Sequence, residues 1–157
     1  MNRTLTTAIV AAAQLVLVGV GVAPQLSART SGETYLLRVA PLDPIDPFRG
    51  AYVSLDYPDL DLADDARHLD DGSGDVFIAL RRQGGTWVAG GRTRTRPDDG
   101  PYLACDDRSW QVRCGIESFF LPQDEAARTE DLLRDGAVAE VRIDSRGNAA
   151  VVDVRAP

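Results

Sequence analysis

The sequence predicts a mainly β domain of the α+β class, preceded by one N-terminal membrane-spanning helix. Three observations support this prediction. No charged residue lies between Arg3 and Arg29. Beyond that run, short segments rich in β-forming residues are separated by turns that contain Gly and Pro. The length of 157 residues suits one modest domain with an appended segment. We therefore expect a compact antiparallel β-sandwich or small barrel, with one short helix near the C-terminus.

The N-terminal segment has the length and composition of a transmembrane helix. Residues 5–23 are nearly all apolar, and at ~1.5 Å per residue about twenty such residues cross a hydrocarbon layer of ~30 Å. Arg3 is on the N-terminal flank, so the positive-inside rule places the N-terminus in the cytoplasm. We expect a cytoplasmic N-terminus over residues 1–4, a signal-anchor over 5–26 and an extracytoplasmic domain over 27–157.

A cleaved signal peptide and a buried core helix are the alternatives to a retained anchor. Residues 21–23 are small enough at the required positions for cleavage, but Pro24 would follow the cut directly and make a poor substrate. A core helix would carry a polar face, which this segment lacks. We therefore expect a single-pass protein of the cell membrane, with residues 24–32 as a short polar stalk.

The rest of the chain is expected to form short strands and one helix. Residues 51–57 alternate strictly between two faces, which is typical of a half-buried strand. The predicted helix covers residues 124–134, with Asp124 as its N-cap and Gly136 after its end. Residues 59–75 are an acidic connection. The other predicted strands are residues 35–39, 75–80, 86–89, 102–105, 109–114, 116–121, 137–143 and 149–155.

The charge balance excludes several functions. The sequence has 17 Lys+Arg against 24 Asp+Glu, a net charge of -7, and every one of these cations is Arg. An acidic chain repels nucleic acid, so we expect no nucleic-acid partner. The absence of Lys excludes mechanisms that need a lysine amine.

One segment, residues 48–57, resembles the motif after which the bacterial GDYXXLXY family is named. Gly50, Tyr52, Leu55 and Tyr57 match the motif, whereas an Ala at position 51 replaces the family's Asp. A second segment, residues 112–122, is similar to the family's Tyr-Gly-Ile-Glu-Ser-Tyr-Phe-Val-Pro stretch. The order and spacing of the two segments also agree with the family.

This resemblance implies a membrane-anchored bacterial protein with an extracytoplasmic domain. The family has no established activity, so the resemblance implies a location and not a reaction. Family members are often encoded near multi-span membrane proteins, which implies a membrane or cell-envelope protein as partner. We therefore expect a non-enzymatic interaction domain. A small extracytoplasmic hydrolase, or a sensor of a ligand or of Ca²⁺, is the alternative.

Polar residues of the two motifs are the candidate binding residues. Arg49, Tyr52, Arg113 and Glu117 could line one polar groove for a ligand. The structural alternative, which we favour, is that Arg49 or Arg113 forms an ion pair with Glu117 and holds the two segments together. Tyr57 is expected in the core with its hydroxyl at an edge.

The backbone role of Gly50 and the two cysteines complete the structural predictions. Gly50 is expected to supply a backbone conformation that a side chain would forbid. Cys105 and Cys114 flank a short loop and are expected to form a disulfide, with free thiols or a redox pair as alternatives.

His68 is the only His, and no nucleophile elbow accompanies it. We therefore expect no catalytic residue, no metal and no cofactor.

Overall fold

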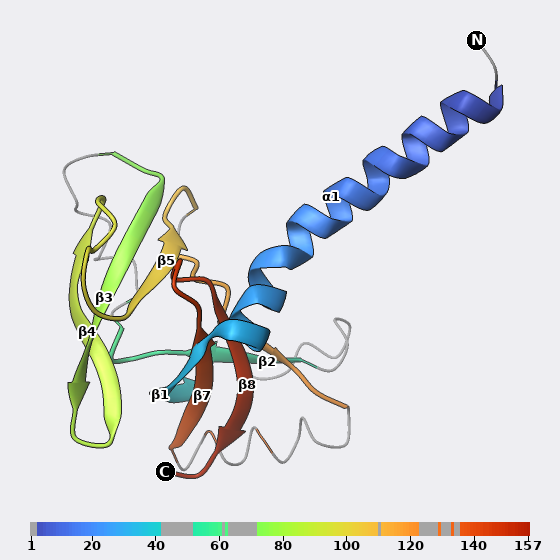
Figure 1. The fold of residues 1–157 in the computed structure, drawn as a ribbon. Coiled ribbons are helices and arrows are strands. Elements are labelled where there is room, and N and C mark those ends of the chain that lie inside the picture. Colours follow the sequence, from blue (N-terminus) through green and yellow to red (C-terminus); the bar gives the residue numbers. More distant parts are fainter. Residues whose placement is uncertain are drawn as a thin grey trace.

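The computed structural model describes residues 3–41, 52–60, 62, 72–109, 111–122, 129, 133 and 136–157. Within these ranges one helix is followed by antiparallel strands (Figure 1). The elements are α1 (Arg3–Ser31), β1 (Glu33–Pro41), β2 (Tyr52–Asp56), β3 (Asp75–Gln83), β4 (Thr86–Thr93), β5 (Tyr102–Asp106), β6 (Ser118–Phe120), β7 (Ala137–Ile143) and β8 (Ala149–Arg155).

The strands form two sheets. One has five strands in the order β6-β2-β1-β7-β8, and the other has three in the order β4-β3-β5. All of their pairings are antiparallel. The prediction of a mainly β domain after an N-terminal apolar helix is confirmed. The two sheets remain open, so the barrel alternative is wrong.

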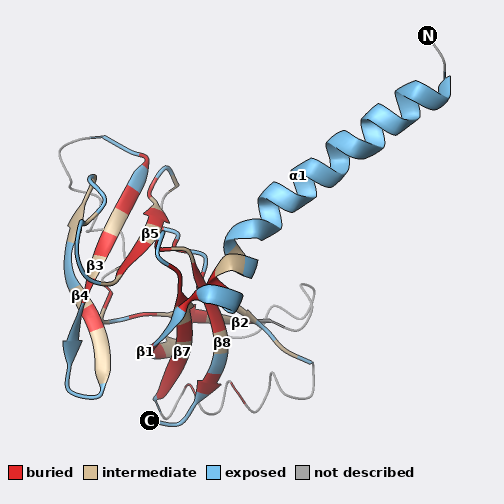
Figure 2. Ribbon diagram, in the orientation of Figure 1, coloured by how far each residue is buried: buried red, intermediate tan, exposed pale blue. Residues whose placement is uncertain are grey.

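One hydrophobic core takes side chains from both sheets. Leu37 of β1 and Leu55 of β2 meet Ile78 of β3 and Leu103 of β5 in the same cluster. Each of these side chains is almost completely buried, and Figure 2 shows the buried positions concentrated on the strands. Burial of apolar surface on this scale is the main source of the domain's stability.

Helix α1 is longer than the sequence predicts. It continues through Pro24 to Ser31, so the expected polar stalk over residues 24–32 is wrong. A proline inside a helix removes one backbone hydrogen bond, but here the following turns pack on β7 and β8. The N-terminal part projects away from both sheets and is exposed along its length (Figures 1 and 2).

Two hairpins form, one from β3 and β4 and the other from β7 and β8. The turn between β3 and β4 has Gly84 at φ 64°, and the turn between β7 and β8 has Gly147 at φ 80°. These are left-handed backbone conformations, which glycine adopts without strain. Only Gly also fits position 147, because an added Cβ would lie 2.8 Å from the Ala104 nitrogen.

Two expected strands near the second motif are wrong in extent. Residues 109–114 form only an isolated bridge in the described chain, between Asp106 and Arg113, and the strand expected over 116–121 is reduced to β6. At this point the amides of Cys114 and Gly115 bind the Glu117 carboxylate across a turn in which Gly115 has φ 80°, and they are therefore not paired with a neighbouring strand.

Several expectations fall outside the described residues. They include the positions of Arg49, Gly50 and His68 and most of the acidic connection. Of the helix expected over residues 124–134, the structure describes only Thr129 and Leu133, which are both helical and buried.

Candidate functional site

The two motif segments lie side by side in the five-stranded sheet. β2 carries the first motif and pairs with β6 of the second, with Val53 opposite Phe119. The Leu55 amide extends this contact by donating a hydrogen bond of 2.9 Å to the Glu117 carbonyl. The fold therefore joins the two stretches that carry the family resemblance, although they are far apart in the sequence.

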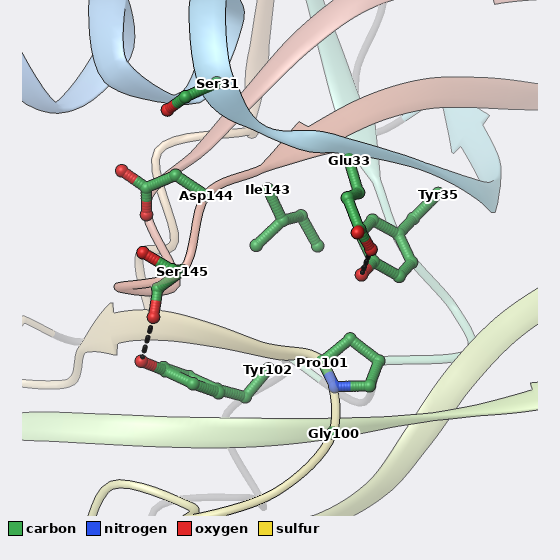
Figure 3. Close-up of a pocket in the computed structure, with 9 residues that line it drawn as sticks. All are labelled: Ser31, Glu33, Tyr35, Gly100, Pro101, Tyr102, Ile143, Asp144 and Ser145. Carbon is green, nitrogen blue, oxygen red and sulfur yellow. Dashed lines mark hydrogen bonds between the residues drawn. The ribbon is translucent and has the colours of Figure 1, made fainter.

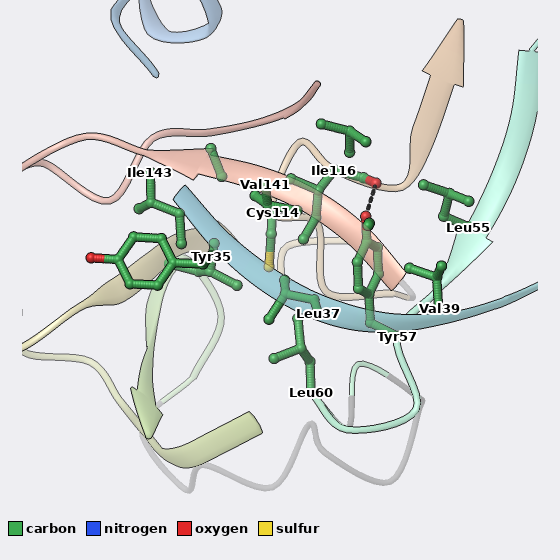
Figure 4. Packing of buried hydrophobic residues seen from close by; sticks show 14 of the residues in the cluster. Tyr35, Leu37, Val39, Leu55, Tyr57, Leu60, Cys114, Ile116, Val141 and Ile143 are labelled. Carbon is green, nitrogen blue, oxygen red and sulfur yellow. Dashed lines mark hydrogen bonds between the residues drawn. The ribbon is translucent and has the colours of Figure 1, made fainter. Parts of the chain in front are cut away.

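Tyr57 anchors this contact from within the core. Its side chain is 1% exposed, and its hydroxyl donates a hydrogen bond of 2.8 Å to the Ile116 carbonyl (Figure 4). Burial, followed by the negative charge of Glu117, raises the pKa of Tyr57 well above its ordinary value. The phenol therefore stays protonated and remains a donor. The core position agrees with the sequence prediction, but the hydroxyl is buried on a carbonyl and not at an edge.

Glu117 is bound by backbone amides. Its carboxylate accepts hydrogen bonds from the Cys114 amide and, at 3.1 and 3.2 Å, from the Gly115 amide. In the described part of the chain it forms no ion pair with Arg113, whose side chain is exposed. The left-handed conformation of Gly115 directs successive N–H groups at one acceptor, so backbone amides stabilise this carboxylate where the described residues provide no cation.

A disulfide holds the same turn to the other sheet. The Sγ atoms of Cys105 in β5 and Cys114 lie 2.02 Å apart, as the sequence predicts. Beside them, the backbones of Asp106 and Arg113 exchange two hydrogen bonds of 2.8 Å. The turn that contains Gly115 is therefore bonded to β5 of one sheet and, through Tyr57 and Leu55, to the β2 segment of the other.

The C-terminal end of α1 docks on this turn and on β7 and β8. We call residues 24–31 the docked end. Gln25 donates a hydrogen bond of 3.0 Å to the Gly115 carbonyl. Ser27 donates one of 2.5 Å to the Asp144 carboxylate, and Ala28 is 0% exposed. The helix is thus bonded directly to the β domain.

Arg142 of β7 closes the end of the helix. Its guanidinium donates hydrogen bonds of 3.0 and 2.8 Å to the Gly32 carbonyl and another to the Arg29 carbonyl. A cation at this place satisfies carbonyls that no helical amide can reach, and it also interacts favourably with the helix dipole. The close fit leaves no room at Gly32, where a Cβ would lie 2.8 Å from the Ile143 nitrogen.

Asp144, at the end of β7, receives the docked end. Burial alone raises the pKa of its carboxyl, but hydrogen bonds from Ser27, Asn148 and the amides of Arg146 and Asn148 outweigh burial and bring the pKa below its usual value. The carboxylate is therefore ionised at neutral pH and is an acceptor for Ser27.

The family model of GDYXXLXY proteins matches residues 14–154. The chain belongs to the GDYXXLXY family. No curated protein and no solved structure matches it. In this GDYXXLXY protein, Leu55 and Tyr57 of the naming motif are core residues. The described contacts give them a structural role, which is to hold the turn on which α1 docks.

A groove of about 460 Å³ lies where α1 meets this turn. We call it the junction groove. It is lined by Gln25 and Arg29 of α1, by Glu117, Phe119 and Phe120 of the second motif, and by Val151 of β8. Arg113 lines a separate hollow of about 340 Å³, which shares Gln25 and Gly115 with the junction groove. The GDYXXLXY protein therefore does not bring Arg113 and Glu117 into the single polar groove that the sequence suggests.

A third hollow, of about 390 Å³, opens between the two sheets (Figure 3). Tyr35 and Tyr102 lie on opposite sides of it. Their hydroxyls donate hydrogen bonds of 3.0 Å to Glu33 and 3.1 Å to the Ser145 carbonyl. No cluster of metal-binding side chains is present among the residues that the structure describes.

Sequence reasoning missed the α1 side of the junction groove. The sequence contains one signal for it, since Arg29 is the first charged residue after the apolar run and Gln25 is the first long polar one. That signal shows where the apolar run ends, but it does not show which surface of the domain the side chains meet.

Proposed function

We propose that this GDYXXLXY protein is a membrane-anchored, extracytoplasmic interaction domain that engages a membrane or cell-envelope protein. The anchor is α1, which is long and apolar enough to cross a membrane. The positive flank at Arg3 favours an orientation with the N-terminus in the cytoplasm.

The docked end of α1 is the observation that carries the proposal. A flexible stalk would let the domain move freely, whereas bonds from Gln25, Ser27 and Arg29 to the β domain set its orientation relative to the helix. The β3–β4 hairpin then extends away from the N-terminal end of α1 (Figure 1). A domain held in this way presents the same surface to a neighbouring envelope protein at all times, which lowers the entropic cost of binding.

Cysteine labelling in intact cells tests the orientation. The two natural cysteines are paired, so a Cys introduced at Gln83 in the β3–β4 hairpin would be the single free thiol. We expect a membrane-impermeant maleimide to label it without lysis, and to label a Cys introduced at Asn2 only after lysis. The reverse pattern, or release of the chain from washed membranes, would contradict the anchoring part of the proposal.

Photo-crosslinking from defined positions tests the interaction. A photoreactive residue at Leu17 samples the surface of α1, and one at Gln83 samples the hairpin; both side chains are exposed. We expect at least one position to give a discrete adduct with a membrane or envelope protein in living cells. The same residue at buried Leu37 is the negative control. Membrane-bound protein without any adduct at either position would contradict an interaction function.

A further inference from the structure

The junction groove lies at a defined depth if α1 crosses the membrane. The inference below rests on that part of the proposed function. The apolar run ends at Ala23, and a rise of ~1.5 Å per residue places Gln25 ~3 Å and Arg29 ~9 Å farther along the axis. The headgroup layer extends roughly 5–8 Å beyond each side of a ~30 Å hydrocarbon core. Gln25 therefore lies within this layer and Arg29 lies at its outer edge.

The groove offers one cation and one anion. The Arg29 guanidinium donates a hydrogen bond of 3.2 Å to the Val151 carbonyl. An Arg has five N–H donors, and among the described residues no further acceptor binds the Arg29 guanidinium. Glu117 contributes a carboxylate that the turn amides already hold in place. A carboxylate has about four lone-pair positions, so these amides leave capacity for another donor.

The groove also has an apolar wall beside the helix. Phe119 and Phe120 of β6 both line it, and Phe120 is 76% exposed. Such exposure of a large apolar side chain is unfavourable in water but favourable at the boundary between headgroups and acyl chains. The position of Phe120 next to the end of a membrane-spanning helix is therefore suited to contact with lipid.

We propose that the junction groove binds the headgroup of a zwitterionic phospholipid of the phosphoethanolamine type. The Arg29 guanidinium binds the phosphate, for which its planar set of donors is well suited. The Glu117 carboxylate accepts the ammonium group, and Phe120 packs against the glycerol and the first methylenes. A phospholipid with only a negative headgroup gains the Arg29 contact but meets the Glu117 charge. The groove therefore discriminates in favour of the zwitterionic lipid.

Lipid titration of the purified full-length protein tests this assignment. Delipidated protein in a neutral detergent is titrated with dihexanoyl phosphatidylethanolamine, and bound lipid is counted by native mass spectrometry. Dihexanoyl phosphatidylglycerol serves as the anionic comparison, and water-soluble glycerophosphoethanolamine as the free-headgroup comparison. We expect one saturable phosphatidylethanolamine site, with weaker binding of both comparison ligands.

Three variants assign the groups. Arg29→Gln is expected to weaken phosphatidylethanolamine binding about tenfold, the effect of losing one charged contact. Glu117→Gln keeps an acceptor for the turn amides and is expected to abolish the preference over phosphatidylglycerol. Arg113→Gln, in the neighbouring hollow, is the matched control and is expected to bind as the parent protein does. Far-ultraviolet circular dichroism and thermal unfolding show whether each variant is folded.

Specific outcomes would overturn the inference. Unchanged binding by Arg29→Gln, equal losses in Arg29→Gln and Arg113→Gln, or tighter binding of phosphatidylglycerol would each contradict the site. Equal affinity for glycerophosphoethanolamine would assign a free phosphoester in place of a lipid. If Glu117→Gln is unfolded, dihexanoyl phosphatidylcholine, whose quaternary ammonium has no N–H to donate to Glu117, decides the same point and is expected to bind the parent protein more weakly than dihexanoyl phosphatidylethanolamine; equal binding would contradict the Glu117 contact. A parent chain that leaves the membrane on washing would instead contradict the proposed function.

Discussion

The part of α1 before the docked end, residues 3–23, projects away from the sheets, and we call it the projecting part. The projecting part and the docked end belong to one continuous helix but have opposite environments. Leu17 in the projecting part is 71% exposed, whereas Ala28 in the docked end is 0% exposed. The large apolar side chains of the first part are exposed against the part of the domain that the structure describes, and this apolar surface requires another environment. The second is bonded to both β7 and β8 and to the Gly115 turn.

On the proposed function, this difference would hold the β domain in a fixed orientation on its membrane anchor. Short isolated helices are marginal in water, and most helical stability in proteins comes from tertiary packing. The docked end obtains that packing from the β domain, and the projecting part would obtain its environment from lipid. The boundary between them lies near Pro24, inside the helix and not at its end. On the proposed function, it is the point where the lipid environment gives way to the β domain.

Removal of the disulfide should have the largest effect, because it destabilises the turn of the β domain on which the docked end packs. Cys105→Ala combined with Cys114→Ala frees the turn that receives Gln25. The chain-entropy model gives a loss of about 2.7 kcal/mol for so short a loop. Denaturant unfolding of the full chain in detergent would measure it. The parent protein under reducing conditions should unfold at the same midpoint, and a loss below ~0.5 kcal/mol in both would show that the turn is held without the disulfide.

A methyl group at Gly32 should act next most strongly. In Gly32→Ala the new Cβ would lie against the Ala28 carbonyl and 2.8 Å from the Ile143 nitrogen, and both of these are backbone atoms that move only together with their elements. Overpacking of this kind costs about 1–3 kcal/mol. Gly19→Ala, inside α1, is the control, because a Cβ there meets nothing within 4 Å. Equal stabilities of the two variants would mean that the docked end can shift freely.

Loss of the Tyr57 hydroxyl should lower the unfolding free energy by a smaller amount, because it removes a hydrogen bond that holds the turn at Gly115. Tyr57→Phe leaves the buried Ile116 carbonyl without its donor, which costs about 1–2 kcal/mol. Tyr35→Phe is the control, because its hydroxyl is bonded to the exposed Glu33 side chain. Its loss should stay below ~0.5 kcal/mol. A pH titration followed by tyrosine absorbance should also find one phenol, Tyr57, that ionises only when the protein unfolds.

Lowering the pH should weaken the docking of α1 on the β domain, because the Asp144 carboxylate that binds Ser27 becomes protonated. Its pKa is lower in the folded protein than in the unfolded chain, so the unfolded state takes up the proton first as the pH falls. The associated stability is present above the ordinary pKa of 3.8 and is lost as the pH falls through the folded value. Ser27→Ala removes one of the hydrogen bonds that lower this pKa and should cost about 1 kcal/mol at pH 6. The difference from the parent should shrink at pH 3, and a constant difference would contradict the linkage.

Local sequence signals were sufficient for much of the fold. The apolar run predicts α1, because a helix is set by the pattern of neighbouring residues. Gly84 and Gly147 mark the turns of the two hairpins, because turn type also depends on adjacent residues. The Cys105–Cys114 disulfide also follows from spacing and expected compartment. The five-plus-three arrangement of the strands does not, because it depends on long-range pairings such as Val53 with Phe119.

The junction groove was beyond local reasoning for the same reason. The continuation of α1 past Pro24 depends on β7 and β8, which lie more than a hundred residues later. The binding of Glu117 by amides depends on the left-handed conformation of Gly115, which also moves the strand boundaries expected there. Charge alone suggested an ion pair of Glu117 with Arg49 or Arg113. Arg49 lies outside the described residues, and the structure shows turn amides bound to Glu117 and no ion pair to Arg113.

Shortening a side chain on the projecting part should have the smallest effect on the folded domain. Leu17→Ala removes apolar surface that is 71% exposed and makes no contribution to the core cluster. We expect the unfolding free energy of the β domain to stay within ~0.5 kcal/mol of the parent value, measured by denaturation in detergent with Trp87 fluorescence as the probe. A loss above ~1 kcal/mol would show that the projecting part packs on the domain in solution. It would then remove the contrast with the docked end on which the membrane assignment of α1 depends.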